Sequence, residues 1–137
     1  GEVDEAKLSY ILRDFDLDGL NQRKAKIEEI TKTLQQKYGE DRIIVEIKDS
    51  YYNMKEKIEP VMYIIDLAKK AMKDADVEPK IVPIRGGTDG ARISYMGIPT
   101  PNLFTGGYNF HGYYEYAVAE EMEKAKEVII NIVKNNK

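Results

Sequence analysis

Stretches with strand periodicity and stretches with helical periodicity alternate along this chain of 137 residues, and this alternation limits its fold more than any single motif. Residues 5–14 place Leu8, Tyr10 and Leu12 on one face, which is typical of a half-buried strand. Residues 20–38 have apolar side chains at helical spacing, and Gly39 follows where helices commonly end. Residues 42–48 predict a second strand. Such a unit commonly gives a parallel pair of strands through a right-handed crossover, although another sheet order stays open.

The second half continues the alternation. Its patterns predict helices and strands in turn: a helix over 60–76, a strand over 80–84, a short helix from Thr88 or Asp89 to Gly97, a strand-like segment over 102–105 and a helix over 118–133. We therefore expect an α/β fold with a hinge near residues 49–56. One domain is the default at this length, and two small lobes are also compatible with it.

The composition argues against several classes of partner. The chain has 21 Lys and Arg against 24 Asp and Glu, a formal charge of −3, and its basic residues are interspersed with acidic ones. This pattern predicts no nucleic-acid partner. No apolar stretch approaches the roughly 18 residues needed to cross a bilayer, so we expect no membrane partner. The absence of cysteine excludes disulfides and thiolate chemistry and fits a cytoplasmic protein.

Residues 14–19, DFDLDG, imitate the first half of an EF-hand calcium loop, with carboxylates at positions 1, 3 and 5 and glycine at 6. Position 12 falls on Ala25, so the bidentate glutamate is missing, and the preceding residues indicate a strand instead of a helix. The pattern favours a capped turn at the start of a helix over a calcium site.

A glycine turn, RGGTDG over residues 85–90, follows a predicted strand and begins a helix. Its backbone N–H groups and the helix N-terminus could bind a carboxylate or a phosphate. Neither a Walker lysine nor G-x-G-x-x-G spacing accompanies the turn, so no nucleotide fingerprint is present. A tight turn without any ligand is an equally good interpretation of this spacing.

His111 is the only histidine, and Glu115 follows it by four residues. A catalytic zinc site needs three protein ligands and a water, so this chain cannot build an ordinary one unless carboxylates or another polypeptide complete it. Taken alone, a single histidine is more often structural than a metal ligand. Arg13 taken alone is an ordinary snorkelling or salt-bridged arginine.

Three segments together resemble the C-terminal part of the peptidase T family, the aminotripeptidases among the zinc-dependent exopeptidases. They are YILRDFD, PIRGGTDGA and ISYMGIPTPNLFTGGYNFHG, and they occur in the family's order and spacing. The resemblance covers essentially the whole chain. It implies an α/β fold in which residues 1–50 are the last strand, helix and strand of a lid or dimerisation domain. Residues 51–137 would be the end of the catalytic domain.

The resemblance also implies roles for particular residues. His111 would be the last ligand of a site with two zinc ions, and Arg13 would hold the substrate carboxylate across the closed cleft. Arg85, with the turn Gly86, Gly87 and Thr88, would form the other side of this carboxylate site. Tyr114 stands where the family often has histidine, which is not the ligand position.

The family's other metal ligands and its general-base glutamate precede the part that this chain resembles, so no catalytic residue is assigned here. The resemblance implies a cytoplasmic enzyme that releases the N-terminal residue of tripeptides and that could form a homodimer. It also implies that the chain alone is inactive. A stand-alone anion-binding or oligomerisation module without catalysis is the alternative.

Overall fold

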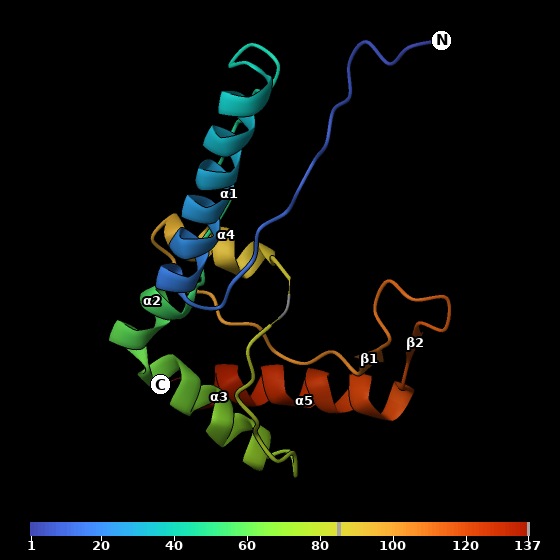
Figure 1. Ribbon diagram of the computed structural model, residues 1–137. Helices are drawn as coiled ribbons and strands as arrows, with labels where there is room; N and C mark the ends of the chain where they lie inside the picture. Colours follow the sequence, from blue (N-terminus) through green and yellow to red (C-terminus); the bar gives the residue numbers. More distant parts are fainter. Residues whose placement is uncertain (85, 137) are drawn as a thin grey trace. The chain divides into compact units, whose positions relative to one another are not determined.

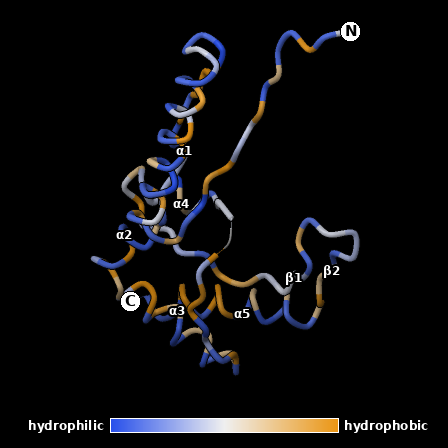
Figure 2. The backbone as a smooth tube through the Cα atoms, in the orientation of Figure 1, coloured by the Kyte–Doolittle hydropathy of each residue, from blue (hydrophilic) through white to orange (hydrophobic). Residues whose placement is uncertain are grey.

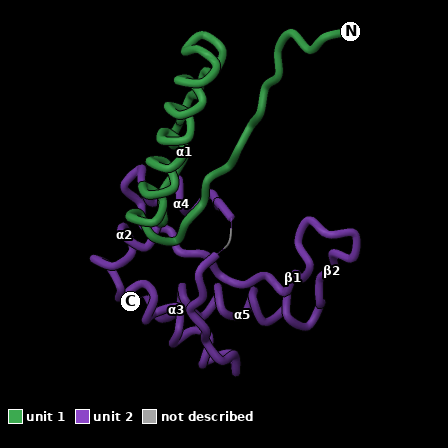
Figure 3. Tube along the Cα trace, viewed as in Figure 1, with its two compact units in different colours: residues 1–53 green, residues 54–137 purple. Residues whose placement is uncertain are grey.

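The computed structural model describes residues 1–84 and 86–136, and the chain divides into two compact units, Gly1–Asn53 and Met54–Lys137 (Figures 1 and 3). Over the described residues the secondary structure is mixed, mostly helical, with one small two-stranded sheet. No helix in this part of the chain is both long and apolar enough to span a bilayer.

The first unit is built on helix α1, Leu17–Tyr38. Asp16 caps its N-terminus, because its carboxylate accepts a hydrogen bond from the Gly19 N–H at 3.3 Å. The helix ends at Gly39, whose φ of 104° lies in the left-handed region that favours glycine. The predicted helix and its glycine stop are therefore confirmed. Asp14 accepts from Arg23 Nε at 2.8 Å, so the DFDLDG segment forms the capped turn.

The two strands expected in this unit, over 5–14 and 42–48, are not present as strands in the described structure. Both segments are without regular structure, and Leu8 and Ile44 are 75% and 86% exposed. A period-two pattern predicts a strand only when a neighbouring strand supplies the hydrogen-bond ladder. Neither segment pairs within the described residues, and Gln35 Nε2 instead donates to the Ile43 carbonyl at 2.8 Å.

The second unit contains the remaining elements. In chain order they are α2 Lys55–Ile58, the 3₁₀ turn η1 Glu59–Val61, α3 Tyr63–Lys73, α4 Asp89–Tyr95, β1 Gly107–Tyr108, β2 Tyr116–Ala117 and α5 Ala119–Asn135. The helices expected over 60–76, 88–97 and 118–133 are thus confirmed with small shifts at their ends. The strands expected over 80–84 and 102–105 are wrong for the described residues, and Figure 2 shows apolar positions along extended stretches as well as along helices.

The core of this unit lies between α3 and α5. Ala71, Ala75 and Val128 are buried there, and four partly buried apolar residues surround them: Met72, Val77, Phe104 and Ile132. The small alanine side chains of α3 allow the two helices to approach closely. The β1–β2 hairpin directly precedes α5 in the chain (Figure 1).

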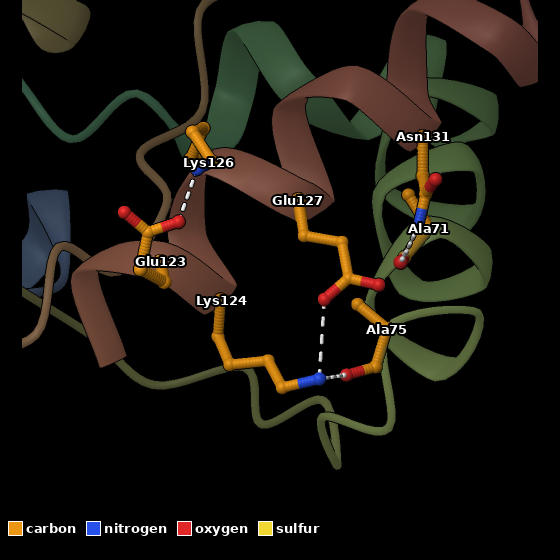
Figure 4. Close-up of polar contacts among 7 residues, drawn as sticks. All are labelled: Ala71, Ala75, Glu123, Lys124, Lys126, Glu127 and Asn131. Carbon is orange, nitrogen blue, oxygen red and sulfur yellow. Dashed lines mark hydrogen bonds and ion pairs between the residues drawn. The ribbon is translucent and has the colours of Figure 1, made fainter. Parts of the chain in front are cut away.

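Two side chains of α5 reach backbone carbonyls in the last turn of α3 and just after it (Figure 4). Lys124 Nζ donates to the Ala75 carbonyl at 2.8 Å and to Glu127 at 3.1 Å, and Asn131 Nδ2 donates to the Ala71 carbonyl at 3.4 Å. Carbonyls at a helix end have no partner within the helix, and a cation is favourable beside them. The two helices are therefore joined by polar contacts at the margin of their apolar core.

Truncation of this core should have a measurable cost. We expect Val128→Ala to lower the free energy of unfolding by about 2 kcal/mol, because it leaves a cavity at a fully buried position. Val133→Ala, on the same helix but 71% exposed, is the matched control and should change stability by less than about 0.5 kcal/mol. Urea unfolding followed by circular dichroism measures both. Equal losses for the two variants would show that the α3–α5 packing does not stabilise the unit.

Candidate functional site

His111 lies at the tip of the hairpin formed by β1 and β2. The strands are antiparallel, with Gly107 opposite Ala117 and Tyr108 opposite Tyr116. The two tyrosine rings stack with their centroids 5.2 Å apart. The sequence pattern did not predict this hairpin.

The backbone of the tip has an unusual conformation. Asn109 and His111 have φ angles of 54° and 64°, in the left-handed region that residues other than glycine seldom occupy. Glu115 Oε2 accepts a hydrogen bond from the His111 N–H at 2.8 Å, and Asn109 Nδ2 donates to the Tyr114 carbonyl at 3.2 Å. These two side chains close the loop from opposite ends, and the His111 side chain stays exposed.

The hairpin is fastened to α5 at its base. The Tyr108 hydroxyl lies 2.7 and 2.8 Å from the two carboxylate oxygens of Glu121, to which it donates. This hydrogen bond, with a smaller contribution from burial, raises the pKa of the Tyr108 phenol. Gly106 has a φ of 79°, and a Cβ added there would lie 2.8 Å from Glu121 Cβ. The Gly106 carbonyl accepts a hydrogen bond from the Val118 N–H at 2.9 Å, which connects the loop to the start of α5.

The described residues contain no group of three or more His, Asp, Glu or Cys side chains that could hold a metal ion. His111 fits the role of a single zinc ligand, because its exposed imidazole projects from a loop whose backbone is fixed by specific contacts. Any metal at His111 would need its remaining ligands from elsewhere.

The glycine turn begins helix α4. Thr88 caps the helix, with Oγ1 accepting from the Ala91 N–H at 3.4 Å and from Asn102 Nδ2 at 3.2 Å. Both contacts use the oxygen as an acceptor, which leaves the hydroxyl hydrogen able to donate. A Cβ on Gly90 would lie 2.5 Å from the Thr100 carbonyl oxygen, so the turn lies tightly against the segment that follows α4. Gly86 and Gly87 are exposed.

The predicted site residues are divided between the two units. Arg85 lies outside the described residues. Arg13 is exposed and belongs to the first unit, whereas His111 and the turn Gly86–Thr88 belong to the second. The convergence of Arg13, the turn and His111 on one substrate therefore stays a prediction.

Three residues that hold the hairpin around His111 were not singled out by sequence reasoning: Asn109 and Tyr108 of the hairpin and Glu121 of α5. The preference of asparagine for the left-handed region is the one signal that could have identified Asn109. Tyr108 and Glu121 are 13 residues apart, and no local pattern relates two residues at that distance.

No protein-family model matches the chain. Individual curated proteins do. Peptidase T of Geobacillus kaustophilus is 61% identical over 134 residues, which is 98% of this chain and 33% of that protein. Peptidase T of Geobacillus sp. strain WCH70 and peptidase T of Clostridium perfringens are each 60% identical over the same shares. The chain is a relative of the C-terminal part of peptidase T.

The match to peptidase T takes in both units, because it covers 134 of the 137 residues. The chain spans about a third of the length of the curated peptidase T proteins that it matches. About two thirds of each of these peptidase T sequences therefore lie outside the matched part.

Proposed function

We propose that this chain forms the C-terminal part of a cytoplasmic zinc aminotripeptidase, an enzyme that releases the N-terminal residue of a tripeptide. The observation that carries the proposal is 61% identity to peptidase T over 98% of the chain. The histidine loop supports it, because three side-chain contacts of that loop and its base present an exposed imidazole. The same identity favours a peptidase over an anion-binding or oligomerisation module without catalysis.

In this proposal His111 is one ligand of a site that holds two zinc ions. Zinc, when bound, polarises the scissile carbonyl and provides hydroxide at neutral pH. The other ligands and the general base belong to the part of a peptidase T-type enzyme that this chain does not match. His111 contributes an imidazole nitrogen whose place is set by its backbone.

The substrate carboxylate is assigned to Arg13, Arg85 and the turn Gly86–Thr88. A guanidinium gives a planar, bidentate pair with a carboxylate, and backbone N–H groups of a glycine turn add donors to it. The first unit would belong to the lid or dimerisation domain and the second to the catalytic domain. Binding of the carboxylate by Arg13 would then require the lid to close, and a homodimer is compatible with this division.

The chain alone should not hydrolyse tripeptides. One imidazole cannot hold two zinc ions, and the described residues offer no cluster that could complete the site. The test compares the 137-residue chain with the complete enzyme, using a tripeptide substrate and added zinc. We expect turnover that a chelator abolishes in the complete enzyme and none in the chain. Chelator-sensitive hydrolysis by the purified chain would contradict this assignment of the metal ligands, and a complete enzyme without peptidase activity would refute the proposed function.

A further inference from the structure

We propose that Glu115 is a positioning residue for His111: its carboxylate holds the backbone of the histidine in the left-handed conformation that presents the imidazole to the metal. The inference rests on the proposed function, because it assigns a role within the same metal site. It assigns Glu115 no contact with metal or substrate.

The first argument is the geometry of the hydrogen bond. Glu115 Oε2 lies 2.8 Å from the His111 nitrogen and accepts its N–H. An ionised acceptor makes a shorter and stronger hydrogen bond than a neutral one. The bond joins the two ends of the loop tip, from the histidine to the residue just before β2.

The second argument is the backbone conformation that this bond accompanies. His111 has a φ of 64°, which is unfavourable for a residue with a Cβ. Such conformations persist where surrounding contacts determine them. Around His111 these contacts are the Glu115 carboxylate and the turn in which Gly112 N–H donates to the Asn109 carbonyl at 2.9 Å. Without this hydrogen bond we expect the histidine to relax toward ordinary φ values, which redirects its Cα–Cβ bond.

The alternative role for Glu115 is that of a metal ligand, and the two roles predict different results for one substitution. Glutamine keeps a side-chain oxygen at the same reach, so Glu115→Gln preserves acceptance of the His111 N–H but removes the carboxylate that a metal would bind. Aspartate keeps the charge but shortens the side chain, so Glu115→Asp should lose the hydrogen bond. Alanine removes both.

The experiment uses the complete enzyme and measures zinc affinity by competition with a chelator, alongside kcat and KM. We expect Glu115→Ala and Glu115→Asp to weaken zinc binding at one of the two sites about tenfold, and Glu115→Gln to remain within about threefold of the wild type. Glu123→Ala is the matched control, since Glu123 is an exposed glutamate of α5 that pairs with Lys126. It should leave zinc affinity unchanged.

Each other outcome is informative. If Glu115→Ala behaves like Glu123→Ala, the positioning role is overturned. Loss of one zinc in Glu115→Gln would make Glu115 a ligand and would overturn it as well. Should Glu115→Ala fail to fold, the contrast between the Asp and Gln variants decides the question alone. His111→Ala separates this inference from the proposed function: a variant that keeps both zincs refutes the metal site itself, whatever the Glu115 variants show.

Discussion

His111→Ala in the complete enzyme should remove zinc from one of the two sites and lower kcat at least about a hundredfold. A residue that ligates the metal directly contributes more than the residues that hydrogen-bond to the ligands. Loss of one of those hydrogen-bonding residues already lowers metal affinity or activity about 10- to 100-fold. Zinc content by atomic absorption and turnover of a tripeptide measure the two effects on the same preparation. Tyr114→Ala is the control, because Tyr114 lies in the same loop, is 78% exposed and is not assigned to the metal.

The hydrogen bond from the His111 N–H to Glu115 does not involve the imidazole, so the alanine variant can keep the loop. An intact loop makes the result specific for the side chain. Two zincs per active site together with near-normal turnover in His111→Ala would return His111 to a structural role.

Arg13→Lys should lower kcat/KM for a tripeptide by at least roughly tenfold, about 1.4 kcal/mol. Lysine keeps the charge but cannot reproduce a planar bidentate pair with a carboxylate. If Arg13 meets the substrate only when the lid closes, the transition state loses this contact as well as the ground state. Steady-state kinetics on a tripeptide and on its C-terminal amide measure the effect.

The amide is the decisive comparison, because an amidated substrate has already lost the charge that Arg13 is proposed to bind. We expect the Arg13→Lys effect on the amide to be much smaller. Arg23→Lys provides a control in the same unit, since Arg23 pairs with Asp14 at 2.8 Å and lowers the pKa of that carboxyl. Equal losses on the acid and the amide would mean that Arg13 supports the fold of its unit and does not bind the carboxylate.

The helices of this chain could be predicted because their signals are local. Gly39 marks the end of α1, and the apolar stripe of α5 faces α3 through Val128. The strands could not be predicted from period-two patterns, since a strand also requires a partner. Leu8 lies in an alternating pattern and Ile44 in an apolar run, yet neither segment has a hydrogen-bond ladder within the described residues.

The sequence predicted which residue types the candidate site contains. It did not predict the hairpin and the contacts that hold these residues in place. His111 and Thr88 stand out in the sequence, as the single imidazole and as a helix cap. The hairpin around His111 has strands of two residues each, too short for a periodic signal. Its geometry depends on Tyr108 and Glu121, which meet only after the chain turns back along α5.

The close approach of Gly106 to α5 has a consequence for how this protein can vary. A methyl group at position 106 would collide with Glu121, so a larger residue there would force the hairpin and the helix apart. Helix α5 in turn packs against α3 through the buried side chain of Val128. Substitutions that shift this packing should therefore alter the direction of the His111 imidazole although they lie far from it in the sequence. The interior of the second unit and the loop that carries His111 should then evolve under a shared steric constraint.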